Sequence, residues 1–293
     1  MKVIDIINSE NPTLSLEVFP PKVSAKYESI EKATEEIAAL KPGFMSVTYG
    51  AGGGTSDFTV SIAENLEKKF DVPVLAHLSC ISSTKEGVRT QLEHIKAAGL
   101  TNILALRGDI PEGMTNSEEW DYHYATELVR EIKEFDKDIC IGGACYPEVH
   151  PDSENQVEDI KHLKEKVDAG CEFLTTQMFF DNNIFYNFLY KVREAGITVP
   201  IVPGIMPLTN INQLKRTLAL SGTVLPLRFR YLLDKFGSDE AAMKQAGIIY
   251  ASEQIIDLYA NGIKNVHVYS MNKPEVALKL MENFSEILKW QRP

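Results

Sequence analysis

The feature that most constrains the fold of this chain is a series of short apolar runs. They recur at intervals of about 30 residues, the length of a strand–helix unit. Most of the runs have a polar or charged residue at or near their carboxyl end. Parallel strands that alternate with helices and end in reactive groups are typical of a (β/α)8 barrel, in which the carboxyl ends of the strands form the active-site rim. The pattern therefore predicts an α/β TIM barrel and an enzyme. The eight runs are TLSLEVF (13–19), FMSVTY (44–49), PVLAHL (73–78), NILALRGD (102–109), CIGGACYPEVH (140–150), EFLTTQ (172–177), VPIVPGI (199–205) and, after a longer gap, NVHVYS (265–270).

The segments between the runs have the pattern of helices. Residues 84–98 place Val88, Leu92 and Ile95 on one helical face. Four such segments end in a glycine that is separated from the next run by one or two residues, as expected for a helix that ends in the left-handed conformation. Those glycines are Gly99, Gly170, Gly196 and Gly262.

The regular spacing is interrupted between the seventh and eighth runs. Helices are predicted there at about 209–221, 226–235 and 238–261, so the barrel carries extra helices before its eighth strand. A last amphipathic helix is predicted at 274–290. Because no segment has the composition of a linker, residues 1–293 are predicted to form one barrel domain.

Composition and charge exclude several classes of protein. The net charge of −11 argues against a nucleic-acid partner, which requires a basic surface. The four cysteines have no CxxC spacing and are predicted to be reduced, buried thiols. The amino terminus lacks the apolar core of a signal peptide, and no apolar run approaches the roughly 20 residues of a membrane span. These features predict a cytoplasmic protein without a membrane span.

Glu17 is the first candidate for chemistry. It lies near the end of the first run, between Leu16 and Val18, and two prolines follow the run. Partial desolvation in such a position raises the pKa of a carboxyl group and suits it to general acid catalysis near neutral pH. The alternative is a structural carboxylate that pairs with a basic residue of the rim.

Three other runs end in groups that suit ligand binding. Arg107 offers a planar donor for a phosphate or carboxylate, and it precedes Gly108 and Asp109, although these three residues are also compatible with a salt-bridged turn. The stiff loop 146–151 presents Tyr146, Glu148 and His150 between prolines. His77 is a candidate donor to a ligand, whereas His94, His123 and His267 are interpreted as structural or surface groups.

Other kinds of site find no support in the sequence. The glycine-rich segment 49–55 lacks the spacing of a phosphate-binding loop. The histidines show none of the spacings of a metal site, and none of the runs ends in a lysine that could form a Schiff base. No metal is therefore predicted.

Seven segments, taken in order, resemble the bacterial methylenetetrahydrofolate reductases and cover nearly the whole chain. This resemblance implies a (β/α)8 barrel that binds FAD at its carboxyl rim. The segments are EVFPPK (17–22), SVTYGA (46–51), ALRGD (105–109), ACYPEVHP (144–151), KVDAG (166–170), TQMFFD (176–181) and VPGIMP (202–207).

The resemblance also implies a reaction. NADH or NADPH reduces FAD and leaves, and the reduced flavin then transfers hydride to 5,10-methylenetetrahydrofolate, giving 5-methyltetrahydrofolate in a ping-pong scheme. Glu17 matches the general acid that protonates N10 as the folate ring opens to its 5-iminium cation. Asp109 matches the aspartate near flavin and pterin, and Gln177 and Gln213 match folate-binding amides.

The same matching assigns a set of FAD contacts. Arg107 and Lys166 have the charge required to face the pyrophosphate. The full set is Thr48, Tyr49, His77, Leu106, Arg107, Gly108, Asp109, Tyr146, His150, Asp159, His162, Lys166, Gln177 and Tyr269.

The chain departs from the family pattern at three positions. His162 and Glu165 stand where asparagine and arginine are expected, and Thr217 stands where well-known bacterial members have a phenylalanine that stacks on NADH. Thr217 keeps open the alternative of an FAD-carrying barrel subunit that takes electrons from a partner protein, such as an iron–sulfur subunit. A separate alternative is a barrel that binds a folate and transfers methyl groups without flavin, which leaves the matches at 107–109 and 146–151 unexplained. The expected partners are thus folate, another copy of the chain in a homo-oligomer, or that iron–sulfur subunit.

Overall fold

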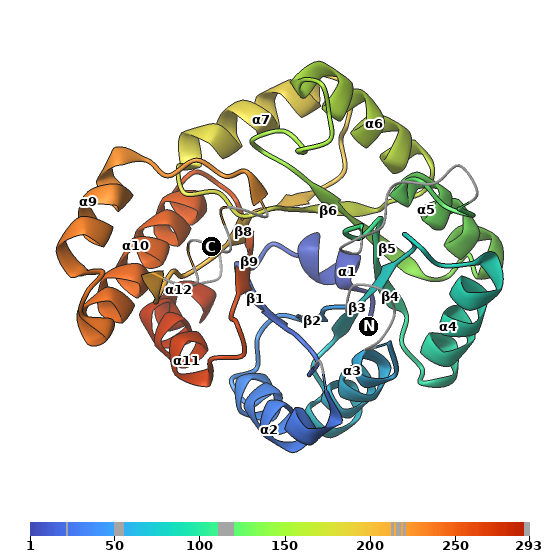
Figure 1. Cartoon of the computed structure of the whole chain (residues 1–293), viewed down its shortest axis with the longest axis horizontal. Coiled ribbons are helices and arrows are strands. Elements are labelled where there is room, and N and C mark those ends of the chain that lie inside the picture. Colours follow the sequence, from blue (N-terminus) through green and yellow to red (C-terminus); the bar gives the residue numbers. More distant parts are fainter. Residues whose placement is uncertain are drawn as a thin grey trace.

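Parallel strands form the centre of the computed structural model (Figure 1), which describes residues 1–21, 23–49, 56–110, 120–211, 214, 218 and 221–289. Every strand pairing is parallel, as expected when each strand is followed by a helix that returns the chain to the same end of the sheet. The strands are β1 (Thr13–Val18), β2 (Met45–Val47), β3 (Val74–Ser79), β4 (Asn102–Leu106), β5 (Cys140–Cys145), β6 (Phe173–Thr176), β7 (Ile201–Val202), β8 (Gly204–Ile205) and β9 (Asn265–Tyr269).

The seventh run gives two short strands rather than the one that was predicted. The strand order is β7-β6-β5-β4-β3-β2-β1-β9-β8, so β7 pairs with β6 and β8 pairs with β9. Pro203 separates the two strands; it has no N–H to donate, but its carbonyl accepts from the His267 N–H at 2.9 Å. Because β7 and β8 are joined through one residue, the sheet closes into the predicted TIM barrel.

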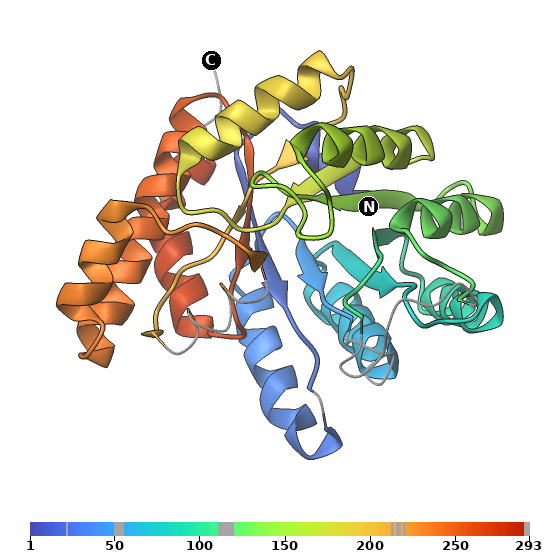
Figure 2. The same cartoon turned by 45° about the horizontal axis from the view of Figure 1, so that its top comes forward.

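Helices surround the barrel, and most agree with the predicted positions. Thr84 caps α4 by accepting a hydrogen bond from the Gly87 N–H at 3.0 Å. The predicted helices at 226–235 and 238–261 correspond to α9 and α10, which pack together on one side of the barrel (Figure 2). The helices are α2 (Tyr27–Ala38), α3 (Ser56–Phe70), α4 (Lys85–Ala97), α5 (Ala125–Phe135), α6 (Gln156–Asp168), α7 (Asn182–Glu194), α9 (Leu227–Phe236), α10 (Glu240–Ala260), α11 (Pro274–Asn283) and α12 (Ser285–Lys289), with a short 3₁₀ helix at Ser24–Lys26.

The structure divides one of the predicted helices and describes only part of another. The helix predicted at 274–290 is divided into α11 and α12 at Phe284, whose side chain is buried. The helix predicted at 209–221 falls largely outside the described residues.

None of the described helices has the length and apolar character needed to cross a bilayer. The four cysteines are free and buried, as predicted.

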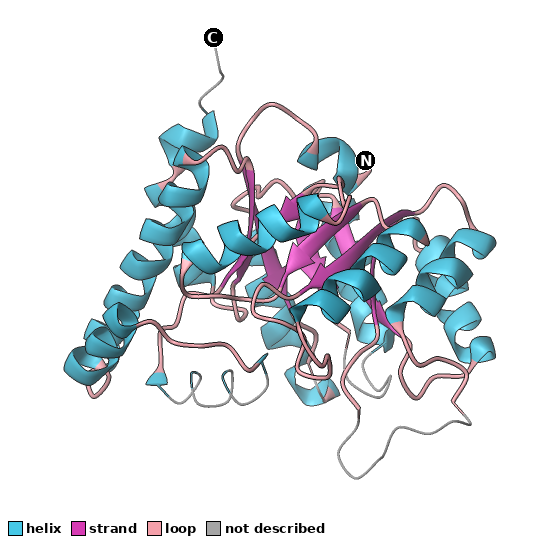
Figure 3. Cartoon of the chain, turned by 90° about the horizontal axis from the view of Figure 1, so that it is seen from above, coloured by secondary structure: helices cyan, strands magenta, loops and turns pink. Residues whose placement is uncertain are grey.

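A short amino-terminal helix that was not predicted, α1 (Val3–Ile7), covers the amino end of the barrel. Figure 3 shows α1 at one end of the strands and the long loops at the other. Val3 and Ile7 are buried against residues from inside the barrel, including Phe44 and Leu104. The Val3 N–H also donates to Asn102 Oδ1 at 2.7 Å. Ligands therefore have to approach from the carboxyl end.

The interior of the barrel is apolar toward its amino end and polar toward its carboxyl end. Toward α1 it is apolar and closely packed: a Cβ on Gly142 would lie only 2.5 Å from the Phe173 ring. Toward the carboxyl ends of the strands, buried Ser15, Ser46 and His267 replace the apolar side chains. Polar groups withdrawn from water in this way require partners within the protein.

Candidate functional site

Glu17 lies inside the barrel near the carboxyl end of β1, and only 18% of its side chain is exposed. Its Oε2 atom is 3.7 Å from His77 Nε2 and 4.0 Å from His267 Nε2, and the carboxyl group hydrogen-bonds Ser46. Glu17 pairs with Ser46 of β2 and Tyr269 of β9 in the sheet. The four neighbouring strands β3, β2, β1 and β9 thus bring these groups together.

His267 links Glu17 to the rest of the polar interior. Its Nε2 lies 3.0 Å from Ser46 Oγ and its Nδ1 lies 2.7 Å from Ser15 Oγ. Its ring stacks on Phe44, with centroids 5.7 Å apart. Both ring nitrogens therefore have partners, and the ring orientation is fixed. His267 was interpreted as structural or surface, so its direct place beside Glu17 is a finding of the structure.

Burial determines the charge states in this cluster. Desolvation raises the pKa of Glu17 to about 8, although its hydrogen bond with Ser46 acts in the opposite direction. Desolvation also lowers the pKa of His77 and of His267 to about 3. At neutral pH the cluster therefore holds a protonated carboxyl group and two neutral imidazoles.

The predicted rise in the Glu17 pKa is confirmed, but its predicted cause was incomplete. Leu16 and Val18, its neighbours in sequence, point outward and pack in the apolar layer between strands and helices. The groups that enclose Glu17 come instead from β2, β3 and β9. His77 Nε2 is buried and has no hydrogen-bond partner among the described residues.

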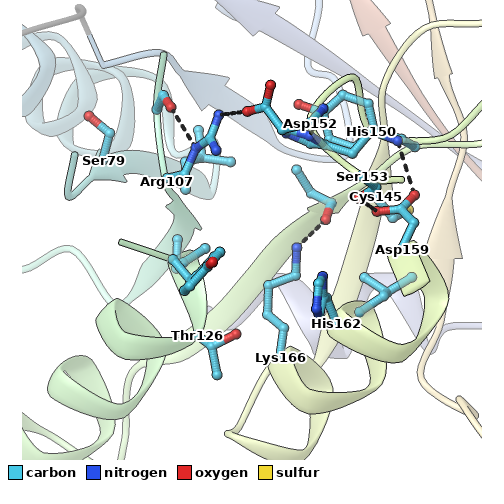
Figure 4. A pocket seen from close by; sticks show the side chains of 18 of the residues that line it. Ser79, Arg107, Thr126, Cys145, His150, Asp152, Ser153, Asp159, His162 and Lys166 are labelled. Carbon is cyan, nitrogen blue, oxygen red and sulfur yellow. Dashed lines mark hydrogen bonds and ion pairs between the residues drawn. The ribbon is translucent and has the colours of Figure 1, made fainter. Parts of the chain in front are cut away.

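A pocket of about 360 Å³ opens beside this cluster, over the carboxyl ends of β4 and β5 (Figure 4). Its volume is within the roughly 300–1,000 Å³ of ligand pockets. Helices α5 and α6 form its walls, with Thr126 on the first and His162 and Lys166 on the second. Ten residues predicted as FAD contacts line it: Tyr49, Leu106, Arg107, Gly108, Asp109, Tyr146, His150, Asp159, His162 and Lys166.

The cations of the pocket already have oxygen partners. Arg107 Nη2 lies 2.7 Å from Asp152 Oδ2, and the Asp152 side chain is 57% exposed. The pKa of Asp152 is lowered by its hydrogen bond with Arg107. Lys166 Nζ donates to the Ala144 carbonyl oxygen. An anion in the pocket would compete with Asp152 for Arg107.

The loop after β5 holds an aromatic pair over the pocket. The rings of Tyr146 and His150 meet edge to face with centroids 4.5 Å apart. The His150 N–H donates to Asp159 Oδ2 at 3.1 Å, and the Asp152 N–H donates to His150 Nδ1 at 3.0 Å. A backbone N–H can only donate, so Nδ1 is the acceptor and Nε2 carries the ring proton. Burial and the neighbouring Arg107 lower the pKa of His150, which favours this neutral form.

The remaining predicted residues lie outside this pocket. Thr48 directly follows β2, and its carbonyl accepts from Thr59 Oγ1 at 2.9 Å. Tyr269 donates to the Thr176 carbonyl across the barrel at 2.5 Å. Gln177 follows β6, and its Oε1 accepts from the Met178 N–H at 2.9 Å. Gln213 and Thr217 are not among the described residues. Glu165 is exposed and does not line the pocket.

Several residues of the site were missed by the sequence analysis. Ser15, Ser46 and His267 have a weak signal, because each occupies an inward position of its strand. Ser46 pairs with Glu17, and His267 pairs with Ser15, two residues before Glu17. Asp152 and Thr126 have no comparable signal, because a loop carboxylate and a first-turn threonine are common on protein surfaces.

The family model and the related proteins point to the same family. The family model described as methylenetetrahydrofolate reductase matches residues 2–285. The 5,10-methylenetetrahydrofolate reductase of Escherichia coli is 35% identical over 264 residues, which are 90% of this chain and 88% of the relative. Methylenetetrahydrofolate reductase (NADH) 1 of Zea mays is 35% identical over 98% of this chain. The chain spans only 50% of that plant protein.

A solved structure with the same fold covers the full barrel. An uncharacterized protein from Clostridium thermocellum, described as binding two copies of 5-methyl-5,6,7,8-tetrahydrofolic acid, superposes with a TM-score of 0.71. The alignment covers 98% of this chain and 100% of that chain. The two sequences are 16% identical, so this likeness bears on the fold alone.

Proposed function

This chain belongs to the methylenetetrahydrofolate reductase family, and we propose that it reduces 5,10-methylenetetrahydrofolate to 5-methyltetrahydrofolate with FAD as its cofactor. NADH or NADPH is the proposed electron donor, in two separate half-reactions. The proposal combines family membership with a protonated carboxyl group and a pocket that contains Arg107 and Lys166 at the same end of one barrel.

The residues of the pocket fit a dinucleotide with a pyrophosphate. Arg107 and Lys166 bring two positive charges to it, and Arg107 can exchange Asp152 for a phosphate oxygen. Tyr146 and His150 offer aromatic surface beside these cations. When bound, FAD would accept hydride from the nicotinamide and supply it to the folate methylene carbon.

Glu17 is the proposed general acid. The five-membered ring of methylenetetrahydrofolate opens when N10 is protonated, which leaves a cationic 5-iminium group that accepts hydride. With a pKa of about 8, Glu17 holds the required proton at neutral pH and is acidic enough to release it. Asp109, exposed at the pocket, would supply negative charge that stabilises the iminium.

Gln177 is the proposed folate contact from the other side of the rim. Its Oε1 accepts the Met178 N–H, which leaves the amide NH₂ group available to a ligand. Gln213 is proposed for the same substrate on the basis of the resemblance alone.

The observation that carries this proposal is the enclosed position of Glu17, whose Oε2 lies 3.7 Å from His77 Nε2 and 4.0 Å from His267 Nε2. Burial there raises the pKa of Glu17, and general acid catalysis at N10 requires a proton that an ordinary glutamate lacks at neutral pH. The test is an anaerobic absorbance trace of the purified protein mixed with NADH or NADPH. A yellow protein that bleaches, and regains colour on adding methylenetetrahydrofolate, would support both half-reactions.

Other outcomes of this trace favour the alternatives. A yellow protein that dithionite bleaches but neither nicotinamide does would point to a protein electron donor, such as an iron–sulfur subunit. A protein that is colourless and does not take up added FAD would contradict the flavin assignment.

A further inference from the structure

Glu148 connects the loop over the pocket to a distant part of the chain. It lies between Tyr146 and His150, both of which line the pocket. Its Oε2 accepts a hydrogen bond from the Val224 N–H at 2.8 Å. Its Oε1 is buried and has no hydrogen-bond partner in the described part of the chain. The carboxyl group thus holds a backbone amide rather than facing solvent.

The segment that Glu148 holds continues to the proposed folate side of the rim. Thr223, next to Val224, is buried and donates through Oγ1 to the Met178 carbonyl at 3.3 Å. The Met178 N–H in turn donates to the Gln177 side chain. A continuous series of contacts therefore runs from the pocket loop, through Glu148, to Gln177.

The loop itself has little freedom to absorb a displacement. Pro147 and Pro151 fix two φ angles, and Val149 has a φ of 81°, a conformation that a β-branched residue rarely adopts. Such a conformation persists only where neighbouring contacts hold it in place. A movement of the aromatic pair should therefore be transmitted to Glu148.

We propose that Glu148 is a positioning residue that couples the flavin pocket to the folate-binding loop, so that occupancy of one strengthens binding at the other. This inference rests on the proposed function, because it takes FAD and folate as the two ligands. Burial, the largest cause, and the nearby Asp181 raise the pKa of Glu148, whereas the hydrogen bond that it accepts from the Val224 N–H lowers it.

The test measures the dissociation constant of FAD, by quenching of its fluorescence, with and without 5-methyltetrahydrofolate. In the unmodified protein, we expect the folate to tighten FAD binding by at least fivefold, and FAD to tighten folate binding by the same factor. In Glu148→Ala this factor should fall to about one. Glu148→Gln should keep it, because a carboxamide oxygen still accepts the Val224 N–H.

Glu154→Ala is the matched control, since Glu154 is an exposed carboxylate a few residues along the same segment. Hydrogen exchange of the apoprotein adds a readout without ligands: the amide of Val224 should exchange faster in Glu148→Ala than in the control. Equal coupling factors in Glu148→Ala and the unmodified protein would overturn the inference while the proposed function stands. An unmodified protein that binds neither FAD nor folate would overturn both.

Discussion

The two halves of the carboxyl rim differ in whether their polar groups are buried and uncharged or charged and partly exposed to solvent. On the side of β1, β2, β3 and β9, Glu17, His77 and His267 are withdrawn from water and uncharged at neutral pH. Around β4, β5 and α6, Arg107 and Asp152 form an ion pair that remains partly open to solvent. One half of the rim therefore holds a protonated carboxyl group, and the other holds charged side chains that contact solvent.

The difference shows how one barrel can provide two electrostatic environments. Burial is costly for a charged group, so the interior shifts pKa values instead of holding ions. At the pocket, Asp152 is largely exposed to solvent, so an entering anion can replace it beside Arg107 at moderate cost. Changes to the two halves should therefore affect different steps, and the predictions follow from the largest effect to the smallest.

Glu17→Gln should have the largest effect. The amide keeps the shape of the side chain but has no acidic proton, so we expect folate reduction to slow by about 10²- to 10⁴-fold. The rate at which the donor reduces the flavin should change little. Stopped-flow absorbance separates the two half-reactions, and an equal loss in both would rule out the general acid role.

Arg107→Ala should mainly weaken the binding of FAD, which is proposed to occupy the other half of the rim. A charge-assisted hydrogen bond is worth about 1.5–3 kcal/mol, so FAD should bind about 10- to 100-fold more weakly. Titration of the apoprotein with FAD measures this directly, with Arg107→Lys as the charge-conserving control. Unchanged affinity in Arg107→Ala would place the pyrophosphate elsewhere.

The two halves should also differ in their response to pH. Glu17 carries its proton below a pKa of about 8, so the rate of folate reduction should fall about tenfold per pH unit above that value. FAD affinity should stay level between pH 6.5 and 9, because Arg107 remains charged and His150, whose pKa is lowered, remains neutral. A rate that rises through pH 8 would show that the ionised carboxylate is the active form.

His77→Leu should leave stability almost unchanged while weakening ligand binding. The leucine replaces a buried ring nitrogen that has no hydrogen-bond partner among the described residues, so the free energy of unfolding should stay the same or increase by about 1 kcal/mol. Chemical denaturation of the apoprotein provides the measurement. A loss above about 2 kcal/mol would show that the imidazole stabilises the fold rather than serving a ligand.

Asp152→Asn should have the smallest effect. An exposed ion pair contributes at most about 1 kcal/mol, so releasing Arg107 should tighten FAD binding by a factor of about two to five. The same titration tests this prediction. Weaker binding would mean that Asp152 orients Arg107 instead of competing with the cofactor.

The barrel could be predicted from the sequence because its signals are local. Each apolar run forms strand, and the four helix-ending glycines have positive φ angles. The helix α1 was missed because five residues are too few to show helical periodicity. The division of the seventh run at Pro203 depends on which neighbour each half pairs with, and that is a property of the closed sheet.

The site was only partly predictable, because much of it depends on contacts between residues that lie far apart in the sequence. Glu17 has a local signal, a carboxylate within an apolar run. His267 has only a weak signal, because its partner Ser46 belongs to β2, at the opposite end of the sequence. The pairing of Arg107 with Asp152 likewise depends on how two separate loops meet. The roles of the FAD and folate contacts stay predictions, as does the single-domain organisation of residues 1–293.

The position of β9 in the sheet has a consequence for the synthesis of this protein. β9 lies between β1 and β8, and pairs Leu14 with Val266. While the chain is being made, β1 therefore has an open edge until residues 265–269 have left the ribosome, about 250 residues after β1 itself. Unpaired strand edges can associate with other chains. The synthesis of β9, the last of the described strands, thus ends the period in which this edge is exposed to misassembly.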